Sequence, residues 1–513
     1  MDVSTKKNTN IFQKSLSAAK YTVLYKILTQ AVSLIVMVFL VRVLSEHDYG
    51  VYNLLYSLIA FIGVVASFGI ANTLQRFIPE YYAKKEFGIA NRLYRLSSAV
   101  RLISNVILLS VIFLFWENIS PILKIAEYKP FFLLFSVVII LHMQRELLEI
   151  CLGAYFLQKY SQGATLVFTL IKCAGYSFAI VLNTGLWEIL ITDLLAYLVA
   201  FILLETIFVC KIPVKKTKMP TAYKKAEKKR LVRYALFYNF NDTGVGLLQA
   251  DFDNFILVGF LDPVAVGAYS FCQRITKTIQ RVSPVTYLQD VIRPAFFSMA
   301  TSDDAVDINK FFNTSLKVNL MFHIPVFLFI VIFGEEIIHV IFNGKFISYT
   351  HVLAGVYFFG MLNSFFSPVG MVAQLRERAD IILYSKIFAV YNLAADVIFI
   401  KYFGISGAVV ATGTAVLCKN IFIWYFVRKD AFICIPGIFW IRFFIFWSTS
   451  AAAVWLVTNA MTTPLIVFAV GAMLFGLLSM AQFQADLFDQ GEKKLFAKTV
   501  KNKTVLKIFR CRE

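Results

Sequence analysis

Continuous apolar runs, each about as long as a lipid bilayer is thick, follow one another through most of this 513-residue chain. Hydrophobic residues make up 59% of the sequence and charged residues 16%, whereas soluble proteins carry about 25% charged residues. A spanning helix needs about 20 consecutive apolar residues, and a spanning β-strand needs only about 10 residues of alternating character. Because the runs are continuous and long, we expect an all-α protein that crosses a membrane many times.

We predict about fourteen transmembrane helices, six before and eight after a basic stretch in the middle of the chain. In this stretch, Lys211–Arg233, ten residues are Lys or Arg and one is acidic. No cleavage site of a secretory signal follows the first run, so we expect that run to be retained as a span. The predicted spans are residues 22–43, 49–73, 96–116, 130–152, 162–183, 188–210, 234–261, 264–292, 311–333, 347–373, 380–401, 405–427, 437–459 and 463–482.

The positive charges are distributed unevenly between the predicted loops. With the N-terminus placed inside, the inner segments hold 34 Lys and Arg residues, and the outer loops hold only Lys124, Lys129 and Lys345. Lys and Arg are enriched on the cytoplasmic side of membrane proteins. We therefore expect a protein of the cytoplasmic membrane with both termini and the basic stretch in the cytoplasm. The net charge of +19 is explained by this topology and does not indicate binding to nucleic acid.

The same topology divides the chain into two lobes of six spans each. An internal repeat supports the division, because four residues recur at identical spacing: Val41, Leu44, Gly50 and Tyr52 correspond to Val258, Leu261, Gly267 and Tyr269. We expect each motif to form a tight outer turn in which glycine relieves backbone strain. Six spans are an even number, so the two repeats are parallel. The predicted parts are an N-lobe (1–210), a basic cytoplasmic linker (211–233), a C-lobe (234–427), accessory spans 13 and 14 (428–482) and a basic cytoplasmic tail (483–513).

Three stretches carry a family resemblance: Arg42–Gly50 (RVLSEHDYG), Asn72–Tyr81 (NTLQRFIPEY) and Gly404–Thr412 (GISGAVVAT). In this order, on fourteen predicted spans, the chain resembles the Wzx-like oligosaccharide flippases, or polysaccharide biosynthesis proteins, of the multidrug/oligosaccharidyl-lipid/polysaccharide (MOP) exporter superfamily. The resemblance implies two lobes around a central cavity, which opens alternately to each side and moves an undecaprenyl-linked sugar. It assigns no role to an individual residue.

Charged residues within spans are the candidates for a transport path, because a charge in the bilayer is costly unless it is paired or faces water. Arg274, Lys277 and Arg281 have the spacing of one face of the eighth predicted helix. Either carboxylates of the seventh span, Asp242 and Asp253, pair with these cations, or some cations remain available for the diphosphate of a lipid-linked substrate. Arginine suits the second role because its guanidinium group binds phosphate through two parallel hydrogen bonds.

Four more cations are candidates for the cavity. Lys172 lies near the middle of the fifth span, where we expect a cavity or a carboxylate partner. Lys26 either extends to the inner membrane surface or lines the cavity. Arg76 is either an interfacial anchor or a phosphate ligand at the inner mouth. Lys419 lies deep in the twelfth span, where structural pairing and cavity lining are both open.

Carboxylates within the spans are the candidates for coupling to an ion gradient. They are Asp242 and Asp253 in the seventh span and Glu149 in the fourth. The fourth span also offers local ion pairs, because His142 and Glu146, and Arg145 and Glu149, are each four residues apart on one helical face.

The sequence carries no signature of covalent chemistry. It has no phosphate-binding loop, and its seven cysteines form no C-x-x-C motif or His/Cys cluster, so we expect no enzyme activity, cofactor or metal site. We expect a flippase that moves a polyprenyl-diphosphate-linked oligosaccharide by alternating access, for surface polysaccharide biosynthesis. Its expected partners are this substrate, membrane lipids and other polysaccharide-assembly proteins. A lipid II-type flippase and a cation-coupled multidrug exporter are the alternatives, and the cations of the eighth span argue against the exporter.

Overall fold

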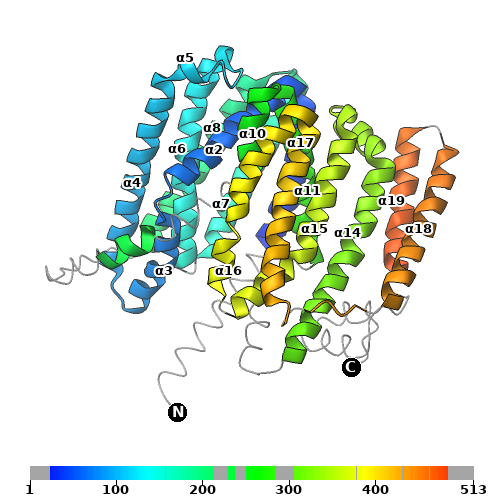
Figure 1. The fold of residues 1–513 in the computed structure, drawn as a ribbon. Coiled ribbons are helices and arrows are strands. Elements are labelled where there is room, and N and C mark those ends of the chain that lie inside the picture. Colours follow the sequence, from blue (N-terminus) through cyan, green and yellow to red (C-terminus); the bar gives the residue numbers. More distant parts are fainter. Residues whose placement is uncertain are drawn as a thin grey trace. The chain divides into compact units, whose positions relative to one another are not determined.

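A computed structural model describes residues 24–155, 157–212, 229–236, 250–284, 305–376, 378–429, 432–435, 437–461 and 463–482. Every regular element within these residues is a helix (Figure 1), which confirms the predicted all-α class. The chain divides into two compact units, Met1–Gly267 and Ala268–Glu513. The predicted boundaries of the lobes, the linker and the tail stay predictions.

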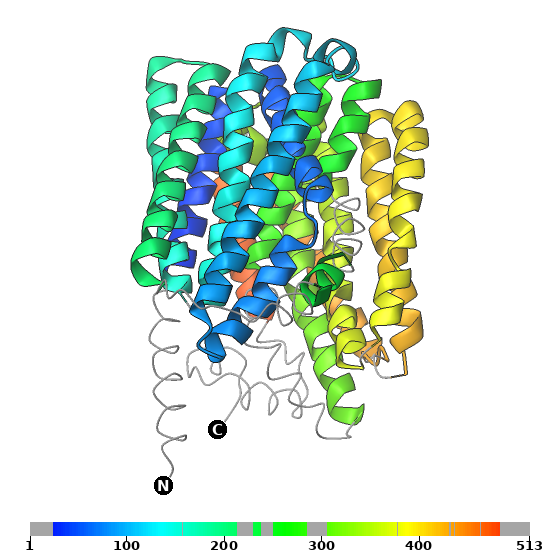
Figure 2. The same ribbon diagram turned by 90° about the vertical axis from the view of Figure 1, so that its left-hand side faces the viewer.

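In the first unit, long helices form a bundle. Two of their outward-facing side chains, Leu114 and Val181, are each 76% exposed, as expected for residues in contact with lipid. Helices α4, α6, α7 and α8 run side by side in both ribbon views (Figures 1 and 2). The described helices are Leu24–Val43, α2 (Glu46–Val65), α3 (Ile70–Ala83), α4 (Phe87–Leu114), α5 (Trp116–Ile119), η1 (Ala126–Tyr128), α6 (Lys129–Ala154), α7 (Gln158–Leu182), α8 (Leu186–Lys211), residues 229–236 and α10 (Ala250–Phe260).

In the second unit, α14 lies between α15 and α19, and α15 packs against α17. Aromatic side chains fill the contact of α14 with the last two helices, where Phe333 of α14 meets Phe475 of α19 edge to face with ring centroids 6.1 Å apart. The elements are α11 (Pro263–Val282), which begins at the end of the first unit, α14 (Ala305–Phe342), η3 (Ile347–Tyr349), α15 (Thr350–Leu375), α16 (Ala379–Tyr384), α17 (Ile387–Val427), α18 (Gly437–Asn459) and α19 (Pro464–Ala481).

Eleven helices in the described residues are long and apolar enough to cross a membrane. This confirms a multi-pass membrane protein, although it does not confirm the count of fourteen. The eleventh and twelfth predicted spans lie in one continuous segment, Asp380–Val427. Within α17, Gly404 leaves the helical conformation, with φ 59° and ψ −137°. The seventh and eighth predicted spans correspond to α10 and α11, and each extends into residues outside the described ranges.

The second predicted span, residues 49–73, extends too far at its inner end. The helix α2 ends at Val65, and a separate helix, α3, starts at Ile70. Between them, Phe68 and Gly69 both have positive φ angles, 42° and 62°. A Cβ atom on Gly69 would lie 2.0 Å from the carbonyl oxygen of Ala235, so the break is also a point of close backbone approach.

The role predicted for the repeat glycines is also wrong. Gly50 lies inside α2 and Gly267 inside α11, and neither has a positive φ angle. Instead, a Cβ atom on Gly50 would lie 1.7 Å from the carbonyl oxygen of Pro263, and one on Gly267 would lie 3.0 Å from that of Glu46. The two motifs therefore need glycine because their backbones touch, and not because a turn is strained.

Candidate functional site

A buried carboxylate, Asp193 on α8, organises the middle of the first unit. It is fully buried and forms an ion pair of 2.8 Å with Nζ of Lys172 on α7. Three tyrosine hydroxyls donate hydrogen bonds to the same carboxylate: Tyr176 at 2.6 Å, Tyr52 at 3.0 Å and Tyr56 at 2.5 Å. Four donors from α2 and α7 thus converge on one side chain of α8.

The surroundings of Lys172 stabilise its charge further. Its ammonium group lies 5.3–5.5 Å from the ring centroids of Tyr56, Phe168 and Tyr176, within the range of cation–π attraction. Of the two environments expected for Lys172, the structure shows the carboxylate partner. This ion pair satisfies the charge of Lys172 within the protein, and the predicted role of Lys172 in substrate binding stays a prediction.

The fourth predicted span, in α6, carries one of the two local pairs expected from the sequence. Nη2 of Arg145 lies 2.8 Å from Oε1 of Glu149, which confirms that pair. The expected pair of His142 and Glu146 is wrong. Glu146 instead pairs with Arg101 of α4 at 2.7 Å, and His142 contacts the hydroxyl of Tyr197 on α8 at 3.1 Å. Both His142 and Glu146 therefore have their partners on neighbouring helices and not on α6.

Arg76 lies at one end of the first unit beside an acidic side chain. Its Nη1 donates a hydrogen bond of 3.1 Å to Glu80, one turn further along α3. Arg230 binds both oxygens of Glu80, at 3.1 and 2.9 Å, and Lys84 binds it at 2.8 Å. The hydrogen bonds from Arg230 and then Lys84 lower the pKa of Glu80 to about 2, so this carboxylate stays ionised at neutral pH.

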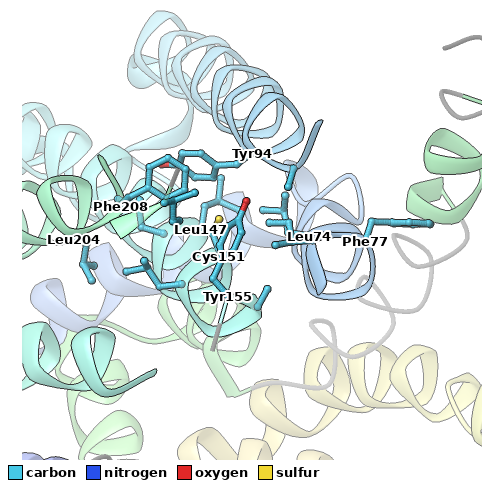
Figure 3. Packing of buried hydrophobic residues seen from close by; sticks show 14 of the residues in the cluster. Leu74, Phe77, Tyr94, Leu147, Cys151, Tyr155, Leu204 and Phe208 are labelled. Carbon is cyan, nitrogen blue, oxygen red and sulfur yellow. The ribbon is translucent and has the colours of Figure 1, made fainter. Parts of the chain in front are cut away.

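An apolar cluster holds α3 against the rest of the first unit at this end. Figure 3 shows Leu74 beside Cys151 and Tyr155 of the α6 end, with Leu204 and Phe208 of α8 on the other side. All five side chains are at least nine-tenths buried. The cluster fixes the spacing between α3 and α6.

A pocket of about 480 Å³ opens next to this cluster, between α3, α6 and α7. Gln75 and Pro79 line it from α3, Glu149 and Gly153 from α6, and Gln158 and Gln162 from α7. Residues 74–95 and 153–161 are inner segments in the topology predicted from the charges, so we expect the pocket to lie at the cytoplasmic end. Among the candidate site residues, only Glu149 contributes to its lining.

Two of the three cations of α11, Lys277 and Arg281, are exposed. Gln280 donates a hydrogen bond of 2.7 Å to the carbonyl of Gly360 on α15, and Thr276 is buried. At about 100° per residue, Lys277 and Arg281 lie about 60–140° around the helix from these two residues, and both are exposed. In the described part of the chain, no carboxylate pairs with either of these two cations.

The structure places the remaining candidates as follows. Arg274 is half-buried on α11 and has an interaction partner, and Lys26 is exposed near the start of the first helix. Lys419 is half-buried in α17. Asp253 is fully buried in α10, and Asp242 lies outside the described residues. The described residues contain no group of three or more His, Cys, Asp or Glu side chains suited to a metal ion.

Sequence reasoning missed Asp193 and the tyrosines Tyr52 and Tyr56. A signal was present, because Asp193 is a carboxylate inside the apolar run from Leu186 to Lys211, where a charge is costly unless it is paired. The spacing within one helix does not show that α2 and α7 bring their hydroxyl and ammonium groups to this carboxylate.

Comparison with known proteins identifies the family. The family model "Polysaccharide biosynthesis protein" matches residues 16–300, which is more than half of the chain. The chain belongs to this family. A second model, "Lipid II flippase MurJ", matches residues 179–483, so the two models overlap in the middle of the chain. These matches confirm the resemblance to the Wzx-like flippases of the MOP superfamily.

Two curated relatives of this polysaccharide biosynthesis protein are named for glycan assembly. The lipopolysaccharide biosynthesis protein WzxC of Escherichia coli is 21% identical over 74% of this chain and 73% of its own length. The probable low-salt glycan biosynthesis flippase Agl15 of Haloferax volcanii is 25% identical over 73% of this chain and 75% of its own length.

Two solved structures show that this protein has the fold of the MOP transporters. An inward-facing multidrug resistance MATE transporter of the MOP superfamily matches with a TM-score of 0.64 and 14% identity, over 78% of this chain and 94% of the transporter. The lipid II flippase MurJ in an inward closed conformation matches with a TM-score of 0.61 and 14% identity, over 90% of this chain and 99% of MurJ. At this identity, the likeness concerns the fold alone.

Proposed function

We propose that this protein flips a polyprenyl-diphosphate-linked oligosaccharide across the cytoplasmic membrane by alternating access, for the assembly of a surface polysaccharide. The family membership and the names of the two curated relatives support the substrate class. The charge distribution of the sequence supports cytoplasmic termini. Other polysaccharide-assembly proteins are proposed partners, and Asp242 and Asp253 are proposed sites of ion coupling.

The observation that carries the proposal is the exposed cationic face of α11. Lys277 and Arg281 lie one turn apart, and no carboxylate in the described residues neutralises them. A membrane helix that retains two such cations is suited to an anionic ligand. A diphosphate supplies the negative charge, and its oxygens accept charge-assisted hydrogen bonds from both the ammonium and the guanidinium group.

The lipid II flippase alternative shares this anionic chemistry, and the match to the MurJ family model favours keeping it as the second candidate. A diphosphate joined to a different sugar would bind the same cations. A multidrug exporter for cationic compounds fits less well, because the face of α11 would repel its substrate. The similarity to the MATE transporter concerns the fold alone and does not support a multidrug exporter.

Replacing the two cations tests the proposal. In vesicles that contain an undecaprenyl-diphosphate-linked oligosaccharide, we expect Lys277→Gln and Arg281→Gln each to reduce the translocation rate about 10- to 100-fold. This is the effect of losing one hydrogen bond between charged groups, which contributes about 1.5–3 kcal/mol. The measurement is the rate at which the oligosaccharide becomes accessible to a glycosidase on the opposite side.

A matched control is Lys429→Gln, which removes the same charge from an exposed lysine that follows α17. We expect this variant to flip at the wild-type rate. Insertion and thermal stability of each variant are measured separately. Wild-type rates for both α11 variants, with normal insertion, would remove α11 from the mechanism.

A further inference from the structure

We propose that the pocket between α3, α6 and α7 binds a sugar residue of the lipid-linked substrate through its hydroxyl groups. This inference rests on the proposed function and assigns part of the substrate to the first unit. The pocket volume of about 480 Å³ lies within the range of about 300–1,000 Å³ that is usual for small-ligand sites.

The polar groups of the pocket match hydroxyl chemistry. Gln75 and Gln162 line the pocket from α3 and α7, and neither side chain has a hydrogen-bond partner in the described residues. Each carboxamide offers both a donor and an acceptor, as each sugar hydroxyl does. Two such groups from different helices can hold neighbouring hydroxyls of one sugar ring.

Glu149 adds an oriented acceptor. Arg145 binds its Oε1 atom at 2.8 and 2.9 Å, and the hydroxyl of Thr165 binds the same atom at 3.1 Å. No donor in the described residues binds Oε2, so this oxygen is available to the pocket that Glu149 lines. The guanidinium of Arg145 is itself fixed 4.1 Å from the ring centroid of Phe168.

The charge balance argues for a neutral ligand. Because Arg145 neutralises Glu149, the pair attracts neither a cation nor an anion strongly. A phosphate would in addition meet the free carboxylate oxygen, which accepts hydrogen bonds and repels negative charge. A polyhydroxylated ring carries no charge to repel, and its hydroxyls can donate to Oε2. The pocket is therefore suited to a neutral sugar.

A glycine keeps the pocket open. Gly153 lies in its lining near the end of α6, and a Cβ atom there would meet no other atom within 4 Å. A larger side chain at this position would extend into free space without a backbone clash. The neighbouring residues Cys151 and Tyr155 belong to the buried cluster in Figure 3, so the helix that carries Gly153 is held in place.

The test is Gly153→Leu in vesicles that contain undecaprenyl-diphosphate-linked chitobiose. We expect the half-saturating substrate concentration to rise about tenfold or more, since a filled pocket forfeits several sugar hydrogen bonds. Gln75→Ala and Gln162→Ala should each raise it a few-fold. Free chitobiose should inhibit the wild-type protein and lose that effect on Gly153→Leu, which distinguishes sugar recognition from recognition of the lipid.

The control is Gly476→Leu, the same change at an exposed glycine of α19 that also has no atom within 4 Å of an added Cβ. It should behave as the wild type does. If the wild-type protein flips the chitobiose lipid and Gly153→Leu flips it equally well, the sugar site is wrong and the proposed function stands. If Gly153→Leu impairs bare undecaprenyl diphosphate to the same extent, the pocket binds diphosphate and the assignment is also wrong. A wild-type protein that flips no lipid-linked sugar refutes the proposed function itself.

Discussion

The variant Asp193→Ala is expected to be less stable than the wild-type protein by about 3–5 kcal/mol, because it leaves the ammonium group of Lys172 buried without its counter-ion. Asp193 is fully buried, and the Lys172 side chain is 10% exposed, so water replaces little of the lost interaction. The hydroxyls of Tyr52, Tyr56 and Tyr176 lose their shared acceptor at the same time. Thermal unfolding of the purified protein in detergent measures the change as a lower Tm.

A double replacement separates the structural role of this pair from a role in transport. Lys172→Met together with Asp193→Leu removes both charges, and we expect it to recover most of the stability lost in Asp193→Ala. The recovered protein should still flip substrate if the ion pair only holds α7 to α8. A stable double variant that no longer flips would show that Lys172 binds substrate. A single Asp193→Ala variant with the wild-type Tm would contradict the structural account.

Gly50→Ala is expected to destabilise the first unit by about 2–4 kcal/mol, although it adds only one methyl group. The new Cβ atom would lie 1.7 Å from the carbonyl oxygen of Pro263, and a backbone group has little freedom to move away. Gly267→Ala should have a smaller effect, because its nearest neighbour is 3.0 Å away. Thermal unfolding measures the Tm of each variant, and we expect Gly50→Ala to have a lower Tm than Gly267→Ala.

The matched control for these two variants is Gly259→Ala in α10. It adds the same methyl group within the same unit, at an exposed glycine with no atom within 4 Å of an added Cβ. We expect a neutral or slightly stabilising change, because alanine favours the helix over glycine. Equal stability of Gly50→Ala and Gly259→Ala would show that the two repeat motifs do not touch as described.

The helical class follows directly from the sequence, because uninterrupted apolar runs in lipid must pair their backbone groups internally. The end of a helix is harder to predict when no polar residue marks it. The break at Phe68 and Gly69 has no proline or charged residue within five residues on either side, and the backbone of Ala235, from a distant part of the chain, approaches Gly69 closely. Gly404 interrupts a second stretch in the same way without ending the helical run.

Contacts between helices account for what the sequence did not show about the site. The spacing within α6 predicts the pair of Arg145 and Glu149 correctly, since both residues belong to one helix. The same spacing fails for His142 and Glu146, because Arg101 on α4 lies closer to Glu146. The helical period does place Lys277 and Arg281 together on α11, and both are exposed although Gln280 of the same helix packs against α15.

The most direct test of the account is translocation by the wild-type protein in vesicles, measured with three probes at equal concentration. These are an undecaprenyl-diphosphate-linked oligosaccharide, lipid II and a cationic dye. We predict protein-dependent flipping of the first probe, slower or no flipping of the second, and no transport of the third. Export of the cationic dye without flipping of the lipid-linked oligosaccharide would contradict the account.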